Sequence, residues 1–183
     1  MNRKFTSLAF VSFLLLITPI QTALADYWKG GKTWGGVTIY EFDSSVYDYT
    51  YDYEDVYNQA ISNWEGISSE VSFTEGEHKY ADKYYVGKSS IEGLLGRMDP
   101  YSASGITSLD KNWNYTKVHI FDNNMKSYGM TKAQRISNAT HEIGHSLKLA
   151  HPTQTVTSVM NQGIQSIGPK SYDKSELKDK WGN

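Results

Sequence analysis

The sequence contains no cysteine. This absence excludes a disulfide scaffold, a zinc site with cysteine ligands and a cysteine nucleophile. A basic excess is also missing, because 18 lysine and arginine residues stand against 20 acidic residues and the formal net charge is −2. This balance argues against a nucleic-acid-binding protein. Long apolar runs are scarce as well, since only the N-terminus has one.

The first 25 residues have the pattern of a secretory signal peptide. Arg3 and Lys4 precede an uncharged run over residues 5–20, and Ala23-Leu24-Ala25 forms a small-x-small cleavage site. An uncleaved membrane anchor is the alternative, but the run is shorter than the roughly 20 apolar residues of a membrane-spanning helix. We therefore expect cleavage after Ala25, secretion, and a mature protein with no membrane segment.

Residues 26–183 contain neither a repeat nor a low-complexity linker, which predicts one domain. Hydrophobic and β-branched patterns predict strands over 37–42, 71–74, 83–86, 94–98 and 117–121. Residues 44–53 alternate tyrosine with polar residues, and fit either an exposed strand or a loop. Helices are predicted from about residue 52 to Gly66, from Thr131 to Leu147, and near the C-terminus. Strands and helices in this order indicate a mixed α and β fold.

Two predicted helix starts carry cap patterns. Thr131 is followed three residues later by Gln134, the spacing of a capping box. Asp173 and Glu176 have the same spacing, and Glu176 therefore reads as a cap residue of the last helix. The turn Asp122-Asn123-Asn124 closes the strand that precedes Thr131.

The residues that carry chemistry lie in the segment 141–151, HEIGHSLKLAH. Positions four apart lie on one face of a helix, so His141 and His145 can direct two imidazoles at one ion. Catalytic zinc takes three protein ligands and a water, and His151 is the candidate third ligand. Glu142 directly follows the first ligand, where its carboxylate can take a proton from that water.

A straight helix would not deliver His151 to this site. Ten residues at 1.5 Å place it about 15 Å along the axis from His141. The chain must therefore leave the helix after Leu147 and reverse, and Pro152 is consistent with an ended helix.

The segment resembles the H-E-x-x-H-x-x-G-x-x-H motif of the metzincin zinc endopeptidases, and most closely the matrixin branch. Ser158-Val159-Met160 resembles the Met-turn of this family, which implies that Met160 lies beneath the metal. Residues 60–64, 71–73, 117–121 and 171–182 resemble further parts of the family's catalytic domain. The resemblance implies zinc bound by His141, His145 and His151, with Glu142 as the catalytic base.

The chain departs from this family in three places. Lys148 stands where the family has the glycine that turns the chain, so we predict a left-handed backbone at Lys148 and a near-neutral effect of Lys148→Gly. Gln162 stands two residues after Met160, where the astacin-like and serralysin-like branches place a tyrosine ligand. The cysteine of a matrixin pro-segment is absent.

Other polar residues have weaker patterns. His78 and His119 suggest a second, structural zinc site less strongly than surface or packed histidines. A structural calcium site is weighed against ordinary Asx turns for Asp99, Asp110, Asp122, Asn123 and Asn124. The tyrosines of residues 47–57 are better explained as packing on the first helix than as substrate contacts.

We therefore expect an α+β, metzincin-like catalytic domain over residues 26–183, with a twisted, mainly parallel sheet packed on the active-site helix and a C-terminal helix. The expected function is that of a secreted, extracellular, monomeric zinc endopeptidase that binds a protein or peptide in extended conformation, with residues 152–168 lining the pocket for the residue after the scissile bond. One alternative is a zinc enzyme whose third ligand is Glu176. Another is a non-catalytic protein-binding module that keeps the fold.

Overall fold

The computed structural model describes residues 26–183 of the chain, so the predicted signal peptide at 1–25 lies outside the described residues. The described part folds into a six-stranded sheet, one 3₁₀ turn and four α-helices. In chain order the elements are β1 (Val37–Phe42), η1 (Ser44–Tyr47), α1 (Tyr53–Ser62), β2 (Ser72–Glu75), β3 (Asp82–Gly87), β4 (Gly96–Ser102), β5 (Gly105–Ile106), β6 (Tyr115–Phe121), α2 (Asp122–Ser127), α3 (Lys132–Ser146) and α4 (Ser171–Trp181).

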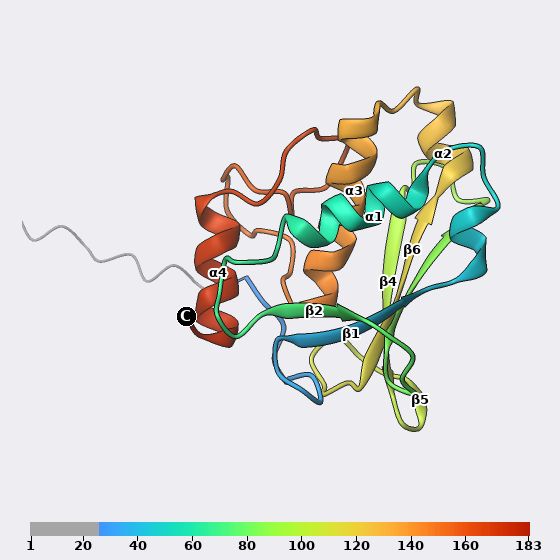
Figure 1. The fold of residues 1–183 in the computed structure, drawn as a ribbon. Coiled ribbons are helices and arrows are strands. Elements are labelled where there is room, and N and C mark those ends of the chain that lie inside the picture. The colour runs from blue at the N-terminus through green and yellow to red at the C-terminus, as the bar shows by residue number, and fades with distance from the viewer. Residues whose placement is uncertain (1–25) are drawn as a thin grey trace, which may run out of the picture.

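The sheet is mixed, with strand order β2-β1-β3-β6-β4-β5. Strands β2, β1, β3 and β6 pair in parallel, whereas β4 pairs antiparallel with both β6 and β5. The sheet twists strongly, so that β1 and β2 run nearly crosswise to β4 and β6 in Figure 1. The fold is therefore α+β, and the three parallel pairs bear out the prediction of a mainly parallel sheet.

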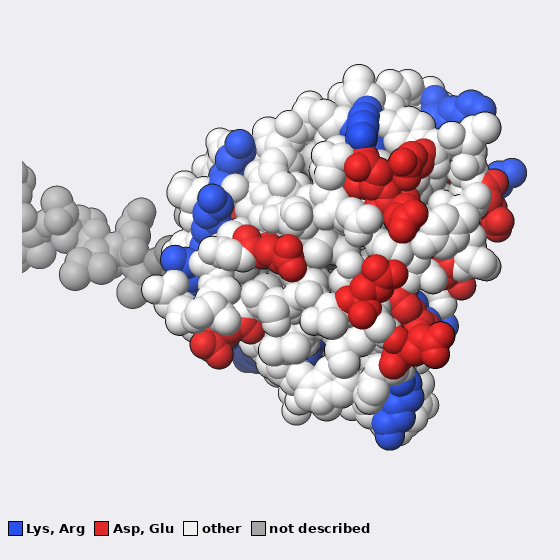
Figure 2. Space-filling model, in the orientation of Figure 1, with Lys and Arg blue, Asp and Glu red and all other residues white. Residues whose placement is uncertain are grey.

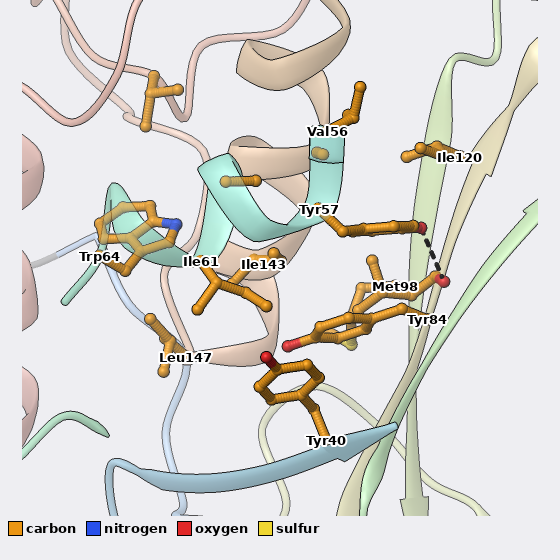
Figure 3. Close-up of a cluster of buried hydrophobic side chains, with 14 of the residues drawn as sticks. Tyr40, Val56, Tyr57, Ile61, Trp64, Tyr84, Met98, Ile120, Ile143 and Leu147 are labelled. Atoms are coloured by element: carbon orange, nitrogen blue, oxygen red, sulfur yellow. Dashed lines mark hydrogen bonds between the residues drawn. The ribbon is translucent and has the colours of Figure 1, made fainter. Parts of the chain in front are cut away.

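Helices α1 and α3 cover one face of the sheet (Figure 1). Along β6 the even-numbered residues Thr116, Val118 and Ile120 are buried beneath these helices, as the alternation of a one-sided strand requires. Figure 3 shows Tyr57 of α1 and Trp64, just after α1, directed into the same cluster as sheet and α3 side chains. One continuous core thus joins α1, α3 and the sheet.

The predicted strands and the first two predicted helices are present. Asp52 caps α1, and Thr131 with Gln134 forms the predicted capping box of α3. Residues 44–53 form no strand, because they contain the 3₁₀ turn η1 and a bend before α1. Asp122-Asn123-Asn124 is not only a turn, since it opens the short helix α2.

The last helix begins three residues earlier than its cap pattern predicted. Its N-cap is Lys170, and Asp173 is the third helical residue, whose carboxylate accepts a hydrogen bond from the Lys170 backbone N–H at 2.7 Å. The prediction that Glu176 is a cap residue is wrong. Glu176 lies inside α4, and its Oε2 accepts a hydrogen bond from the Asp26 backbone N–H at 2.6 Å.

Among the described helices, none has both the length and the apolar character needed to cross a membrane. The face shown in Figure 2 has acidic side chains gathered over α1 and the strands below it, with basic side chains scattered nearer its edges. This face has no continuous basic patch.

Candidate metal centre

Helix α3 positions two of the three predicted ligands, His141 and His145, one turn apart. Between them lies Gly144, which a helix normally disfavours. A Cβ on Gly144 would lie only 2.8 Å from Cζ2 of Trp64 and would also collide with the sulfur of Met160. The glycine therefore allows a buried tryptophan and the buried Met160 to pack directly on the backbone that carries the ligands.

The chain reverses at Lys148, as the sequence predicted. The Lys148 N–H donates to the His145 carbonyl at 3.0 Å and the Leu149 N–H to the Gly144 carbonyl at 3.1 Å, the two bonds of a Schellman motif. Lys148 has a φ of 77°, and is the sole non-glycine residue with positive φ in the described chain. This turn brings His151 back toward α3.

The Nε2 atoms of the three imidazoles converge on one point. His151 Nε2 lies 3.1 Å from His141 Nε2 and 3.2 Å from His145 Nε2. Nitrogens bound tetrahedrally to zinc at 2.0–2.1 Å would lie about 3.3 Å apart. The observed spacing therefore suits three ligands of one ion, and the three ligand atoms lie within 4.8 Å of one another.

Hydrogen bonds to carbonyl oxygens set the tautomers of two of these histidines. His141 Nδ1 donates to Val159 O at 2.9 Å, and His145 Nδ1 donates to Leu149 O at 2.8 Å. Because a carbonyl can only accept, each Nδ1 carries the proton and each Nε2 presents a lone pair. If His151 Nε2 carried a proton, that proton could bond to only one of these two lone pairs. A metal ion instead accepts both, together with the lone pair of a deprotonated His151 Nε2.

The surroundings also favour the neutral, metal-binding form of each ring. Burial lowers the pKa of His141 to about 4 and holds the pKa of His145 well below its usual value. Burial likewise lowers the pKa of His151. Neutral imidazoles with the second nitrogen bonded to a carbonyl are the usual state of histidine ligands, so the residues fit a divalent ion such as zinc.

Glu142 shares a cavity of about 370 Å³ with the three histidines. Its side chain packs against Gly96 of β4 so closely that a Cβ there would lie 2.6 Å from Glu142 Oε1. Burial, with a smaller contribution from Asp99, raises the pKa of the Glu142 carboxyl to about 8. The carboxyl is thus held in a site that disfavours its charge, which is a common property of catalytic acids and bases.

Two chain segments flank this cavity. One segment is residues 93–98, which include the start of β4. The other segment contributes Val159, Gln162, Gly163 and Gln165, a subset of the segment 152–168 that was expected to line a pocket. Trp28, which packs on the His145 ring, Leu109 and the α3 residues Ser137 and Asn138 also line the cavity.

Asp173 of α4 holds the segment around Met160. Its carboxylate accepts hydrogen bonds from the Ser158 hydroxyl and, at 3.0 Å, from the Val159 N–H. The same Val159 residue accepts the Nδ1 proton of His141 through its carbonyl. Val159 therefore links the buried Asp173 carboxylate to the candidate ligand His141.

The remaining candidates take other roles. His78 Nδ1 accepts a hydrogen bond from the Tyr80 N–H, and His119 stacks on Tyr85. Among residues 26–183, the histidine triad is the single group of three or more His, Asp or Glu side chains close enough to hold an ion. The side-chain oxygens weighed for calcium accept hydrogen bonds from protein groups. Asp99 accepts from Arg97, Asp110 from the Lys29 N–H and Asp122 from Tyr53. Asn123 Oδ1 accepts from the Ser89 N–H, and Asn124 Oδ1 accepts from the Asn123 amide.

Several contributors to the site were not predicted. Trp28 packs on the His145 ring with centroids 5.1 Å apart, and Asp26 hydrogen-bonds to both the backbone and the side chain of Thr153. The Lys148 side chain is completely buried. Only the position of Asp26, directly after the predicted cleavage site, could have drawn attention to this segment.

No protein-family model matches this chain, and no curated protein matches it with significant similarity.

Proposed function

We propose that the protein is a secreted zinc endopeptidase of the metzincin type, most similar to matrixins. The observation that supports this most is the meeting of three histidine Nε2 atoms, two of them with the lone pair exposed by an Nδ1–H bond to a carbonyl, in a cavity that also contains the Glu142 carboxyl. The motif resemblance agrees with it, since the same four residues match the family pattern. His141, His145 and His151 would hold the ion.

Zinc in this position supplies a Lewis acid that activates water and polarises a carbonyl group. The protein's own contribution to the proton transfers is Glu142, which directly follows the first ligand. Its ionised form, which a nearby positive charge favours, accepts a proton from the attacking water and returns it to the departing amine. Val159 O and Leu149 O keep the His141 and His145 rings in the orientation required of ligands.

Strand β4 offers the surface for an extended peptide. It pairs with β6 over residues 96–101, but its other edge pairs with β5 only at Tyr101 and Ser102. The start of β4 also lines the cavity. A peptide in extended conformation can add to such a free edge by main-chain hydrogen bonds, which places a peptide bond beside Glu142. This arrangement favours a protein or peptide substrate over a small molecule.

Zinc content and peptide cleavage together test the proposal. We expect one zinc per chain and cleavage within a quenched fluorescent peptide library. Glu142→Ala and the isosteric Glu142→Gln should keep zinc and the thermal melt but lose about 10²–10⁴-fold in kcat, the usual contribution of a general base. Glu41→Gln, at a half-buried carboxylate on the sheet, is the matched control.

Two outcomes would contradict the proposal. Zinc binding without cleavage of any library peptide would favour the non-catalytic, protein-binding alternative. Near wild-type turnover by the Glu142 variants would show that Glu142 is not the general base.

A further inference from the structure

The Lys148 side chain does more than occupy a turn. It is completely buried, although lysine is among the residues least often found inside proteins. No carboxylate lies within ion-pair distance of its Nζ in the described chain. Nζ donates instead to three backbone carbonyls, those of Lys29 at 3.1 Å, Leu109 at 3.1 Å and Lys111 at 2.6 Å.

An aromatic ring completes the surroundings of this ammonium. Nζ lies 3.3 Å from the ring centroid of Trp113, well within the range of a cation–π contact. Trp113 is itself buried and contacts Trp28 edge-on at 6.4 Å. Trp28 then packs on the ring of His145. A continuous chain of contacts therefore leads from the ammonium to a candidate metal ligand.

The carbonyls that bind Nζ belong to two segments far apart in sequence. One contains Lys29 and the other Leu109 and Lys111, and each segment contributes a side chain, Trp28 or Leu109, to the cavity lining. Burial lowers the pKa of Lys148 to about 7, but three converging carbonyls need three N–H donors, which only the charged form of the amine has. Lys148 supplies these donors, and its backbone is fixed by the same turn that brings His151 back toward α3.

We propose that the Lys148 ammonium is a positioning group of the cleft: by binding three carbonyls and the Trp113 ring, it holds in place the two segments that contribute Trp28 and Leu109 to the cavity lining, and with them the contact of Trp28 with His145. The part of this inference that concerns substrate rests on the proposed function. Lys148 acts through other residues and does not touch a substrate. Its loss is expected to impair substrate binding more than the chemical step.

Three variants separate charge from packing. Lys148→Met keeps most of the volume and removes the charge. Lys148→Gly keeps the positive φ and leaves a cavity shaped for n-butylammonium, which has the same four carbons and one nitrogen as the side chain. Lys126→Met is the control, because Lys126 is exposed on α2.

The readouts are KM and kcat for a cleaved peptide, zinc content, near-ultraviolet circular dichroism and hydrogen exchange of the Trp28 and Trp113 amides. Hydrogen bonds to a charged group contribute enough to predict a rise of about tenfold in KM for Lys148→Met and Lys148→Gly, with kcat within about threefold and zinc retained. The two amides should exchange about tenfold faster, and the tryptophan dichroism should weaken. Adding n-butylammonium to Lys148→Gly should reverse these changes, and n-butanol should not.

Each contrary result is informative. Wild-type KM, dichroism and exchange in Lys148→Met would overturn the proposal, and equal rescue by n-butanol would reduce Lys148 to a packing role. If neither Lys148 variant folds, Trp28→Leu tests the same chain of contacts from its half-buried end, and an unchanged KM there overturns the proposal. If the wild-type protein cleaves no peptide, the proposed function fails, while dichroism and exchange still decide the role of Lys148.

Discussion

Gly144 offers a quantitative test of how the ligand helix is packed. Replacing it with alanine would gain about 1 kcal/mol of helix propensity. The new Cβ would lie 2.8 Å from Trp64 Cζ2 and 3.1 Å from Met160 Cε, both shorter than ordinary contacts. Trp64 is fully buried and its Nε1–H donates to the Thr140 carbonyl at 2.9 Å, so its ring has little freedom to move away.

Overpacking of this kind costs about 1–3 kcal/mol, and the restrained ring favours the upper part of that range. After the gain in propensity, Gly144→Ala should lose about 1–2 kcal/mol, or about 2–8 °C in melting temperature for a chain of this size. Because Met160 is one of the displaced groups, Met160→Ala should be less harmful in the Gly144→Ala background than alone.

Thermal and urea unfolding of the zinc-loaded proteins measure these effects. Gly31→Ala is the control, since a Cβ at Gly31 meets no atom within 4 Å and its backbone is not in the positive-φ region. A Gly144→Ala protein as stable as the wild type by both methods would refute the argument that Trp64 and Met160 require a glycine here.

Two further substitutions test the metal centre. His151→Ala should lower zinc affinity sharply, because it removes one of three nitrogen ligands, and stoichiometric zinc surviving dialysis against a chelator would reject His151 as the third ligand. Asp173→Asn should cost about 1.5–3 kcal/mol through its buried hydrogen bonds and also weaken zinc binding, since Val159 links Asp173 to His141. The exposed Asp179→Asn is its control in the same melting and zinc-titration assays, and an equal loss in both variants would contradict this link.

Local patterns predicted what local forces control. Alternation along 37–42 and 117–121 and the capping box at Thr131 were sufficient for β1, β6 and α3. The spacing of His141, His145 and His151 requires a reversal after Leu147, and the glycine of the motif that this segment resembles assigned the positive φ to Lys148. The requirement that three ligands share one ion predicted a contact between His151 and α3 that no local pattern could indicate.

Side chains recruited by distant segments could not be predicted in this way. Asp173 and Glu176 have the spacing of a cap, but Asp173 also binds the chain at 158–159 and Glu176 binds Asp26. The near-neutral effect expected for Lys148→Gly considered the backbone alone, and the bonds from Nζ to three carbonyls replace it with an expected loss. These contacts join residues 14 to 150 positions apart, which no local pattern encodes.

The hydrogen bonds of Asp26 have a consequence for how long an ion would stay in the site. Asp26 holds Ala150 at 2.8 Å and Thr153 at 3.0 Å, on either side of His151, whereas His141 and His145 belong to a helix packed in the core. Regions of a protein open independently, and those with fewer buried contacts open more often. Detachment of the segment at Asp26 would free His151 first and leave a two-ligand site. The residence time of the ion would then follow this local opening and not global unfolding, so that exchange of the ion could be fast in a protein whose core remains intact.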